Sequence, residues 1–179
     1  MQSSGRNDTT IDAILEGFRD PLGPDFVAYR NHCQRVAGLC RAFKSDTMLD
    51  ADKIAIAAAF HDLGIWTAQT WDYLEPSGEL ARSYLSRNGR HEWIDEITES
   101  IAYHHKITPV SSRPPLVEAL RRADLADVSL GLLRSGLAAN EVEAIRSEFP
   151  NAGFHVRLVQ LGCAGALRHP LRPLPMMRW

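Results

Sequence analysis

The segment at residues 51–65, ADKIAIAAAFHDLGI, constrains the fold more than any other part of the chain. It is apolar on nearly every side, which is typical of a helix that runs through the middle of a domain. Asp50 is suited to cap the start of this helix, and Gly64 is placed to end it. We therefore predict a buried central helix that carries His61 and Asp62 in its last turn.

Apolar residues spaced three and four apart predict further helices along the rest of the chain. After a frayed start, they are expected at residues 24–40, 76–89, 93–107, 116–133, 140–150 and 151–168. Asn140 and Glu143 have the spacing of a capping box for one of them. No segment shows the apolar and polar alternation of a strand, and no Gly-rich phosphate loop occurs. The predicted fold class is therefore all-α, a bundle of about seven helices.

The chain of 179 residues is expected to form a single domain. Its core is expected at about residues 24–134, with C-terminal helices at 139–168 and a Pro-rich tail at 169–179. This tail, HPLRPLPMMRW, cannot form a regular helix. An extended strap packed on the domain and a disordered end are both compatible with its composition.

The charge and cysteine content narrow the range of partners and compartments. A net charge of −2 gives no reason to expect duplex nucleic acid or an anionic membrane as a partner. The odd number of cysteines, Cys33, Cys40 and Cys163, indicates reduced thiols packed in the core. The polar start, MQSSGRNDTT, lacks the apolar segment of a signal peptide. We therefore expect a cytoplasmic protein, with a homodimer left open.

The His61–Asp62 pair at the end of the most apolar helix needs a chemical explanation. A carboxylate removed from water without a partner is unfavourable by several kcal/mol or more, and a bound cation removes this difficulty. His32 and Asp124, from two other predicted helices, would complete a set of nitrogen and oxygen ligands that suits a divalent metal and leaves positions for water. A buried ion pair or a helix cap is the alternative for His61 and Asp62, and Asp127 is the alternative to Asp124.

These four residues resemble the signature of the HD-domain superfamily of metal-dependent phosphohydrolases. The matching segments are YRNHCQRV around His32, AFHDLGIW around His61 and Asp62, and RRADLADV around Asp124. The resemblance implies an all-helical fold and one or two divalent ions, which could be Mn, Fe, Co, Ni, Mg or Zn. It also implies hydrolysis of a small phosphorylated metabolite or nucleotide by a metal-activated water, with Asp62 and His61 as catalytic residues.

The segment IAYHHK resembles the additional histidine motif of family members that bind a second metal. His104 and His105 are therefore candidates for a second metal or for substrate, although helical geometry favours only one of them facing the site. Such members usually carry another histidine upstream. Here Glu75 occupies the nearer position, and His91 is the only other histidine in this interval.

Five further residues are candidates for binding the substrate. Lys106, Arg121 and Arg122 are the cations nearest to the predicted ligands and suit a phosphate group. The two arginines fit a solvated helix face equally well. Trp66 and Tyr73 follow the His-Asp pair and are candidates for the wall of a substrate pocket.

Two other functions are compatible with the same residues. Some proteins of this fold hold two irons and use dioxygen to oxidise their substrates, and the double histidine keeps that function open. The third hypothesis is a signalling module that binds a ligand without turnover.

Overall fold

The computed structural model describes residues 8–43, 49–110, 112–168, 170 and 175–177, and these residues contain helices and no strands. The helices are, in chain order, α1 (Thr9–Glu16), α2 (Arg19–Leu22), η1 (Gly23–Asp25), α3 (Phe26–Ala42), α4 (Ala51–Phe60), α5 (Gly64–Thr67), α6 (Leu74–Arg87), η2 (His91–Trp93), α7 (Ile94–Tyr103), α8 (Pro115–Val128), α9 (Ala139–Glu148) and α10 (Phe154–Arg168). The elements η1 and η2 are single 3₁₀ turns. The predicted all-α class is confirmed.

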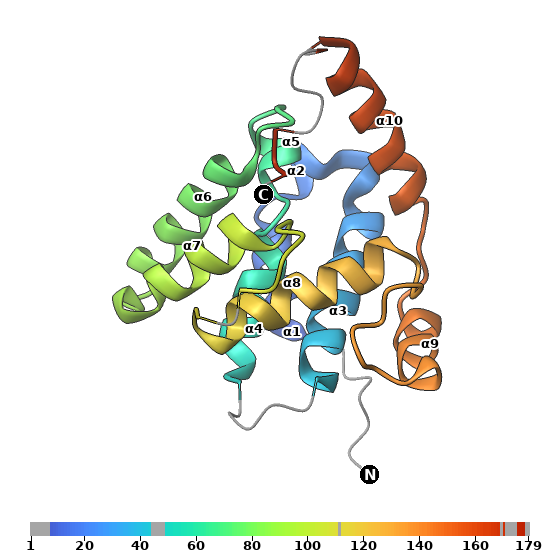
Figure 1. The fold of residues 1–179 in the computed structure, drawn as a ribbon. Coiled ribbons are helices and arrows are strands. Elements are labelled where there is room, and N and C mark those ends of the chain that lie inside the picture. Colours follow the sequence, from blue (N-terminus) through green and yellow to red (C-terminus); the bar gives the residue numbers. More distant parts are fainter. Residues whose placement is uncertain (1–7, 44–48, 111, 169, 171–174, 178–179) are drawn as a thin grey trace.

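Helices α3 and α4 form the centre of the bundle (Figure 1). Every residue of α4 from Ile54 to Phe60 is buried, as are 13 of the 17 residues of α3. The Asp50 side chain caps α4 by accepting hydrogen bonds from the backbone N–H groups of Asp52 and Lys53. The predicted central helix and its cap are both confirmed.

The remaining long helices cover this pair. Helix α1 packs against α3 and α4, while α6 and α7 pack on each other along another side of α4. Helix α8 lies across α3 and α7, and α9 and α10 complete the side beyond α3 (Figure 1). Consequently α3, α4, α7 and α8 meet in the interior, and side chains from all four can reach one point.

The predicted role of Gly64 as the end of the central helix is wrong. Helix α4 ends at Phe60, His61 is its C-cap, and Gly64 is the first residue of α5. A Cβ atom at Gly64 would lie 2.6 Å from the carbonyl oxygen of Tyr73 and 2.9 Å from Ser77 Oγ. Its N–H donates to the same hydroxyl. The glycine is therefore required for the close approach of α5 to α6.

A helix that the sequence did not predict lies near the start of the described residues. Residues 9–16 form α1, whose first turn is capped by Asp8 Oδ1 accepting from Thr10 N–H at 3.0 Å. Ile11, Ile14 and Leu15 are buried in the core. The short apolar stripe of α1 was overlooked because it spans only two turns.

Three further details of the sequence analysis are corrected. Helix α9 begins one residue earlier than predicted, and its capping interaction is Ala138 N–H donating to Glu141 Oε2 at 3.0 Å. The pair Asn140 and Glu143 is therefore not a capping box. Cys33 and Cys40 are buried as expected, but Cys163 is exposed on α10.

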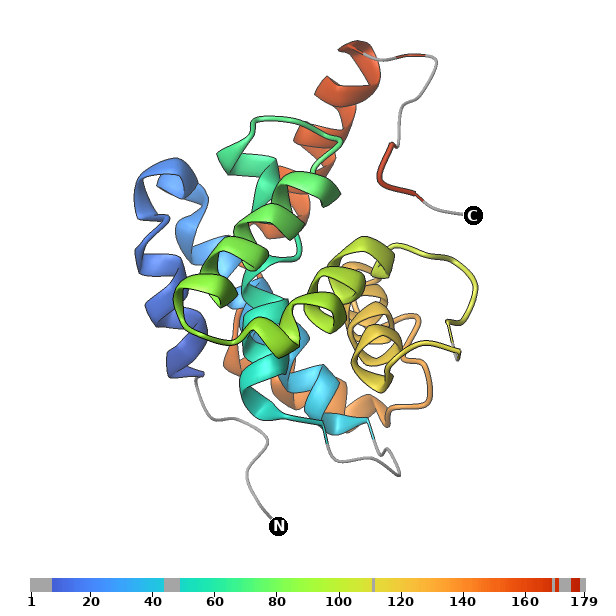
Figure 2. The same ribbon diagram turned by 90° about the vertical axis from the view of Figure 1, so that its left-hand side faces the viewer.

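The Pro-rich tail returns to the body of the protein where it is described. Met176 is only 4% exposed and Met177 packs against the core. This segment lies on the same side of the molecule as α7 and α8 (Figure 2). Residues 169, 171–174 and 178–179 of the tail lie outside the described residues. In the described parts of the chain, no helix combines the length and apolar character needed to cross a membrane.

We expect Gly64→Ala to destabilise the fold by about 1–3 kcal/mol, because the new methyl group would overlap backbone and hydroxyl oxygens of α6. Urea unfolding would measure the change. Gly78→Ala is the matched control, since nothing lies within 4 Å of a Cβ there and it sits inside α6. This control should gain about 0.5–1 kcal/mol. Equal stability of the two variants would contradict the close approach.

Candidate metal centre

The four side chains predicted as ligands converge in the interior from two helices and from the turn that follows α4. His32 comes from α3, His61 and Asp62 from the end of α4, and Asp124 from α8. His32 Nε2 and His61 Nε2 are 2.9 Å apart. Asp62 Oδ2 lies 3.8 and 3.5 Å from these two nitrogens, and Asp124 Oδ1 lies 3.6 and 3.7 Å from them. All four residues are buried.

These separations match the spacing of atoms around a metal ion. Nitrogen and oxygen ligands at about 2.1 Å from a divalent ion lie about 3.0 Å apart at right angles and about 3.4 Å apart in a tetrahedron. The observed range of 2.9–3.8 Å brackets these values. The four atoms can therefore surround a cation with small adjustments of their side chains.

The tautomers of the histidines are fixed by hydrogen bonds outside the cluster. His32 Nδ1 lies 2.7 Å from Asp127 Oδ2, and His61 Nδ1 lies 2.8 Å from the carbonyl oxygen of Ala58. Because both partners are acceptors, each Nδ1 carries the proton and each Nε2 of a neutral ring presents a lone pair. Two lone pairs facing each other at 2.9 Å repel unless a proton or a metal cation lies with them.

A third histidine has the same arrangement. His104 Nδ1 lies 2.7 Å from the carbonyl oxygen of Ile101, so its Nε2 also presents a lone pair to the cluster. That nitrogen, Asp62 Oδ1 and Asp124 Oδ1 are buried and have no hydrogen-bond partner among the described residues. Buried polar atoms without partners cost free energy. A divalent cation would satisfy them and balance the two carboxylate charges.

The carboxylates also control the protonation of His61 when no metal is bound. Burial alone would lower the pKa of His61, but the charges of Asp62 and Asp124 outweigh it and raise the pKa to about 9. Burial would conversely raise the pKa of Asp62, and the neighbouring histidines hold it well below its usual range. The metal-free cluster thus retains a proton on His61, and a bound divalent ion would take the place of that proton.

A buried ion pair behind the cluster holds His32, and the sequence analysis did not find its role. Arg35, one turn after His32 on α3, donates from Nε to Asp127 Oδ1 at 2.6 Å and from Nη2 to Asp127 Oδ2 at 2.9 Å. The same carboxylate accepts from His32 Nδ1, so Asp127 lies behind the ring, and Asp124 is the carboxylate that reaches the cluster. The matching one-turn spacing, His32 with Arg35 and Asp124 with Asp127, was the available signal.

Both histidines of the double-histidine motif face the cluster, contrary to the expectation that only one would. His104 Nε2 lies 3.2 Å from Asp62 Oδ1, and His105 Nδ1 lies 3.6 Å from Asp124 Oδ2. Both residues follow the end of α7 at Tyr103, and their ring centres lie 4.0 Å apart. Asp62 and Asp124 each offer one oxygen to His32 and His61 and the other towards His104 or His105, a layout suited to two bridged cations.

Tyr73 meets this second group of ligands. Its hydroxyl lies 2.5 Å from His105 Nε2. Burial and the nearby His104 lower the pKa of His105 to about 4, so this ring is neutral near pH 7.

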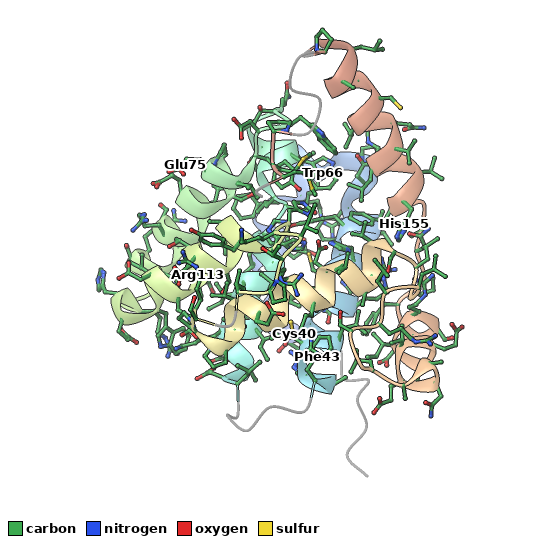
Figure 3. The ribbon with its side chains drawn as sticks, in the orientation of Figure 1. Cys40, Phe43, Trp66, Glu75, Arg113 and His155 are labelled. Atoms are coloured by element: carbon green, nitrogen blue, oxygen red, sulfur yellow. The ribbon has the colours of Figure 1, made fainter. Side chains whose placement is uncertain are left out.

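Glu75, the predicted oxygen ligand, is exposed and lies on the outer side of α6 (Figure 3). His91 is exposed in η2. Tyr73, and not Glu75, is therefore the residue of this segment that contacts His105.

Three of the predicted substrate residues are engaged elsewhere. Arg121 is buried, donates to Glu118 Oε1 at 2.7 Å and is not on a solvated face. Arg122 lies over the Phe43 ring and donates to the carbonyl oxygen of Ser135. Trp66 donates from Nε1 to Asp25 Oδ2 at 2.9 Å. These three side chains are absent from the wall of the pocket that opens onto the cluster.

That pocket has a volume of about 660 Å³. Asp62, Asp124, His104 and His105 line it together with two predicted substrate residues, Tyr73 and Lys106. A volume of this size is typical of sites for small molecules. The cluster is therefore buried in the protein but open to a ligand on one side.

The fold and the cluster define a class, an all-helical protein whose buried histidines and carboxylates are arranged to hold divalent cations. The sequence model of the HD domain family matches residues 29–129, more than half of the chain and all the residues of the cluster. The chain belongs to the HD domain family, within the superfamily of metal-dependent phosphohydrolases. No curated protein and no solved structure gave a match.

We expect Asp127→Asn to weaken Mn²⁺ binding by about 10- to 100-fold, because the carboxylate that orients His32 and raises its basicity is lost. Titration calorimetry on chelator-treated protein would measure this. Asp25→Asn is the matched control, since Asp25 also accepts from an arginine, Arg157, and from a ring N–H, that of Trp66. Equal metal affinity in the two variants would contradict the positioning role.

The stability of the metal-free protein should depend on pH through His61. Its pKa of about 9 lies above the ordinary value of 6.5, so the folded state binds the proton more tightly than the unfolded state. This contribution is complete below pH 6.5 and is lost as the pH rises through 9. Urea unfolding with chelator present should therefore show a falling free energy of unfolding over this interval.

Two variants and one addition check the assignment. His61→Asn should abolish the slope, whereas His91→Asn, which removes an exposed histidine, should retain it. Saturating Mn²⁺ should remove the slope between pH 6.5 and 9, because the metal-bound ring and the unfolded ring are both neutral there. A metal-free protein whose stability is constant over this interval would show that His61 carries no extra proton.

Proposed function

We propose that this protein is a divalent-metal-dependent phosphohydrolase acting on a small phosphorylated molecule through an activated water. One observation carries the proposal: ring nitrogens of His32, His61 and His104 face two buried carboxylates. In this group Asp62 Oδ1, Asp124 Oδ1 and His104 Nε2 have no hydrogen-bond partner among the described residues. Membership of a superfamily composed generally of metal-dependent phosphohydrolases supports the same activity.

Most residues of the cluster would bind the cation, and one would also orient the attacking water. His32, His61, Asp62 and Asp124 would hold one divalent ion, and His104 and His105 fit a second ion that shares the carboxylates. A divalent ion in such a site lowers the pKa of water and polarises a phosphoryl oxygen. When only the first ion is bound, Asp62 Oδ1, which lacks a hydrogen-bond partner among the described residues, can accept the hydrogen bond that orients the attacking water.

Apart from the metal ions, few positively charged side chains in the pocket would bind the phosphate of the substrate. Lys106 is the only lysine or arginine among the described residues that line the pocket. Tyr73 and His105, joined at 2.5 Å, stand beside it and can pass a proton towards a leaving oxygen. One cationic side chain beside the cluster is suited to a single phosphoryl group.

The layout of the ligands also favours a second candidate, oxidation of an organic substrate by dioxygen at two irons. Its specific support is the sharing of Asp62 and Asp124 between two sets of histidines. Iron at two atoms per chain together with oxygen consumption would establish this function in place of hydrolysis.

We expect phosphate release from a simple aryl phosphate with Mn²⁺ or Co²⁺, and at least about a hundredfold loss of kcat/KM in Asp62→Ala, because this variant removes a ligand and the group that orients water. Elemental analysis of protein purified without chelator would be measured alongside. Asp20→Asn, an exposed carboxylate on α2, is the control and should retain full activity. A metal-loaded protein that binds phosphate esters without hydrolysing them would favour a ligand-binding module.

A further inference from the structure

The walls of the pocket above the cluster are almost entirely apolar. Beyond the residues of the cluster, Tyr73 and Lys106, its described lining consists of aliphatic, aromatic and methionine side chains and one glycine. They come from α8, from α10, from the turns beside these helices and from the tail segment, and they include Leu125, Leu133, Leu158, Val159, Met176 and Met177. No arginine, amide, hydroxyl of serine or threonine, or additional carboxylate is among the described lining residues.

Such a wall discriminates against polar substrates. Sugar hydroxyls, base edges and further phosphate groups lose hydrogen bonds to water on entering a pocket, and they need polar partners there. The described walls above the cluster offer Lys106 as their only cationic partner. Apolar groups, in contrast, gain free energy in proportion to the surface that they bury.

The apolar wall on α10 is fixed to the cluster itself. Phe154, the first residue of α10, stacks on the ring of His32 with 4.0 Å between ring centres and 16° between planes. Met176 is buried against the core on the same side of the pocket. The hydrocarbon surface therefore stands at a set distance from the ligands, as required for a substrate with one phosphate end and one apolar end.

We propose that the substrate is a phosphate monoester of an apolar alcohol or phenol, with its hydrocarbon part held between α8, α10 and Met176–Met177. This assignment rests on the proposed phosphohydrolase function and names its substrate class. In the reaction, a water oxygen forms a bond to phosphorus and the phosphorus–oxygen bond to the alcohol breaks. One water proton passes to the leaving oxygen, giving the free alcohol and inorganic phosphate.

A homologous series of n-alkyl phosphates from ethyl to octyl tests the proposal by phosphate release from the Mn²⁺-loaded protein. We expect kcat/KM to rise about fourfold for each methylene that enters the pocket. Glycerol 3-phosphate and a nucleoside 5′-monophosphate should be at least about a hundredfold poorer than octyl phosphate. A flat series, or a preference for the polar esters, would overturn the proposal while leaving the phosphohydrolase function in place.

Binding of the corresponding n-alkyl phosphonates, which cannot be hydrolysed, separates the two hypotheses. Affinity measured by titration calorimetry should rise along the same series. If phosphonate affinity rises with chain length but no ester releases phosphate, the phosphohydrolase function is refuted, and so is the monoester as substrate. In that case only the apolar subsite remains supported. Binding independent of chain length would refute the subsite itself.

Two exposed valines on α10 provide a matched pair of variants. Val159 lines the pocket and is 65% exposed, whereas Val156 lies one turn earlier, is 62% exposed and does not line it. Val159→Asn should lower kcat/KM for octyl phosphate by about fivefold and leave ethyl phosphate unchanged. Val156→Asn should change neither value. Equal effects of both variants on octyl phosphate would count against the assigned wall.

Discussion

The burial of Asp62 and Asp124 opposite three histidine nitrogens is the constraint around which the structure is arranged. Two carboxylates in the interior are unfavourable unless positive charge accompanies them. The histidines and carboxylates of the cluster come from α3, α7, α8 and the end of α4. The charge balance of the cluster therefore depends on the packing of these four helices against one another. A cation at this point therefore joins elements that are far apart in the sequence, and its loss would weaken the centre of the bundle.

Helix α3 connects the cluster to the outer part of the site. Arg35 donates to the carbonyl oxygen of Phe149 at 2.9 Å, and Asn31 donates to that of Pro150 at 2.8 Å. These bonds hold the turn from which α10 starts, and Phe154 then packs on His32. The same helix thus supplies a candidate ligand, orients that ligand through Asp127, and places the wall of the pocket.

The four residues that the sequence predicted as ligands lie together in the structure, whereas the surroundings of the cluster differ from the prediction. His32, His61, Asp62 and Asp124 could be found because a His-Asp pair on an apolar helix is costly without partners, and the ordered motif supplied them. Arg121 and Trp66 contact other residues and do not line the pocket. The sequence could not indicate this, because spacing along a helix shows which residues share a face, but not which helix lies opposite. The wall of α10 was beyond reach for the same reason, since it depends on contacts across more than a hundred residues.

The bonds that His61 and His104 make to the carbonyl oxygens three residues before them have a mechanical consequence. Each ring closes the last turn of its helix, α4 or α7, while its other nitrogen points into the cluster. The negative end of each helix dipole is thereby directed towards the place where positive charge is needed. If either helix terminus frayed, its histidine would move away from the cluster. A bound ion would in turn stabilise both termini. The order of the last turns of α4 and α7 is therefore coupled to the binding of a metal ion through the two imidazole rings.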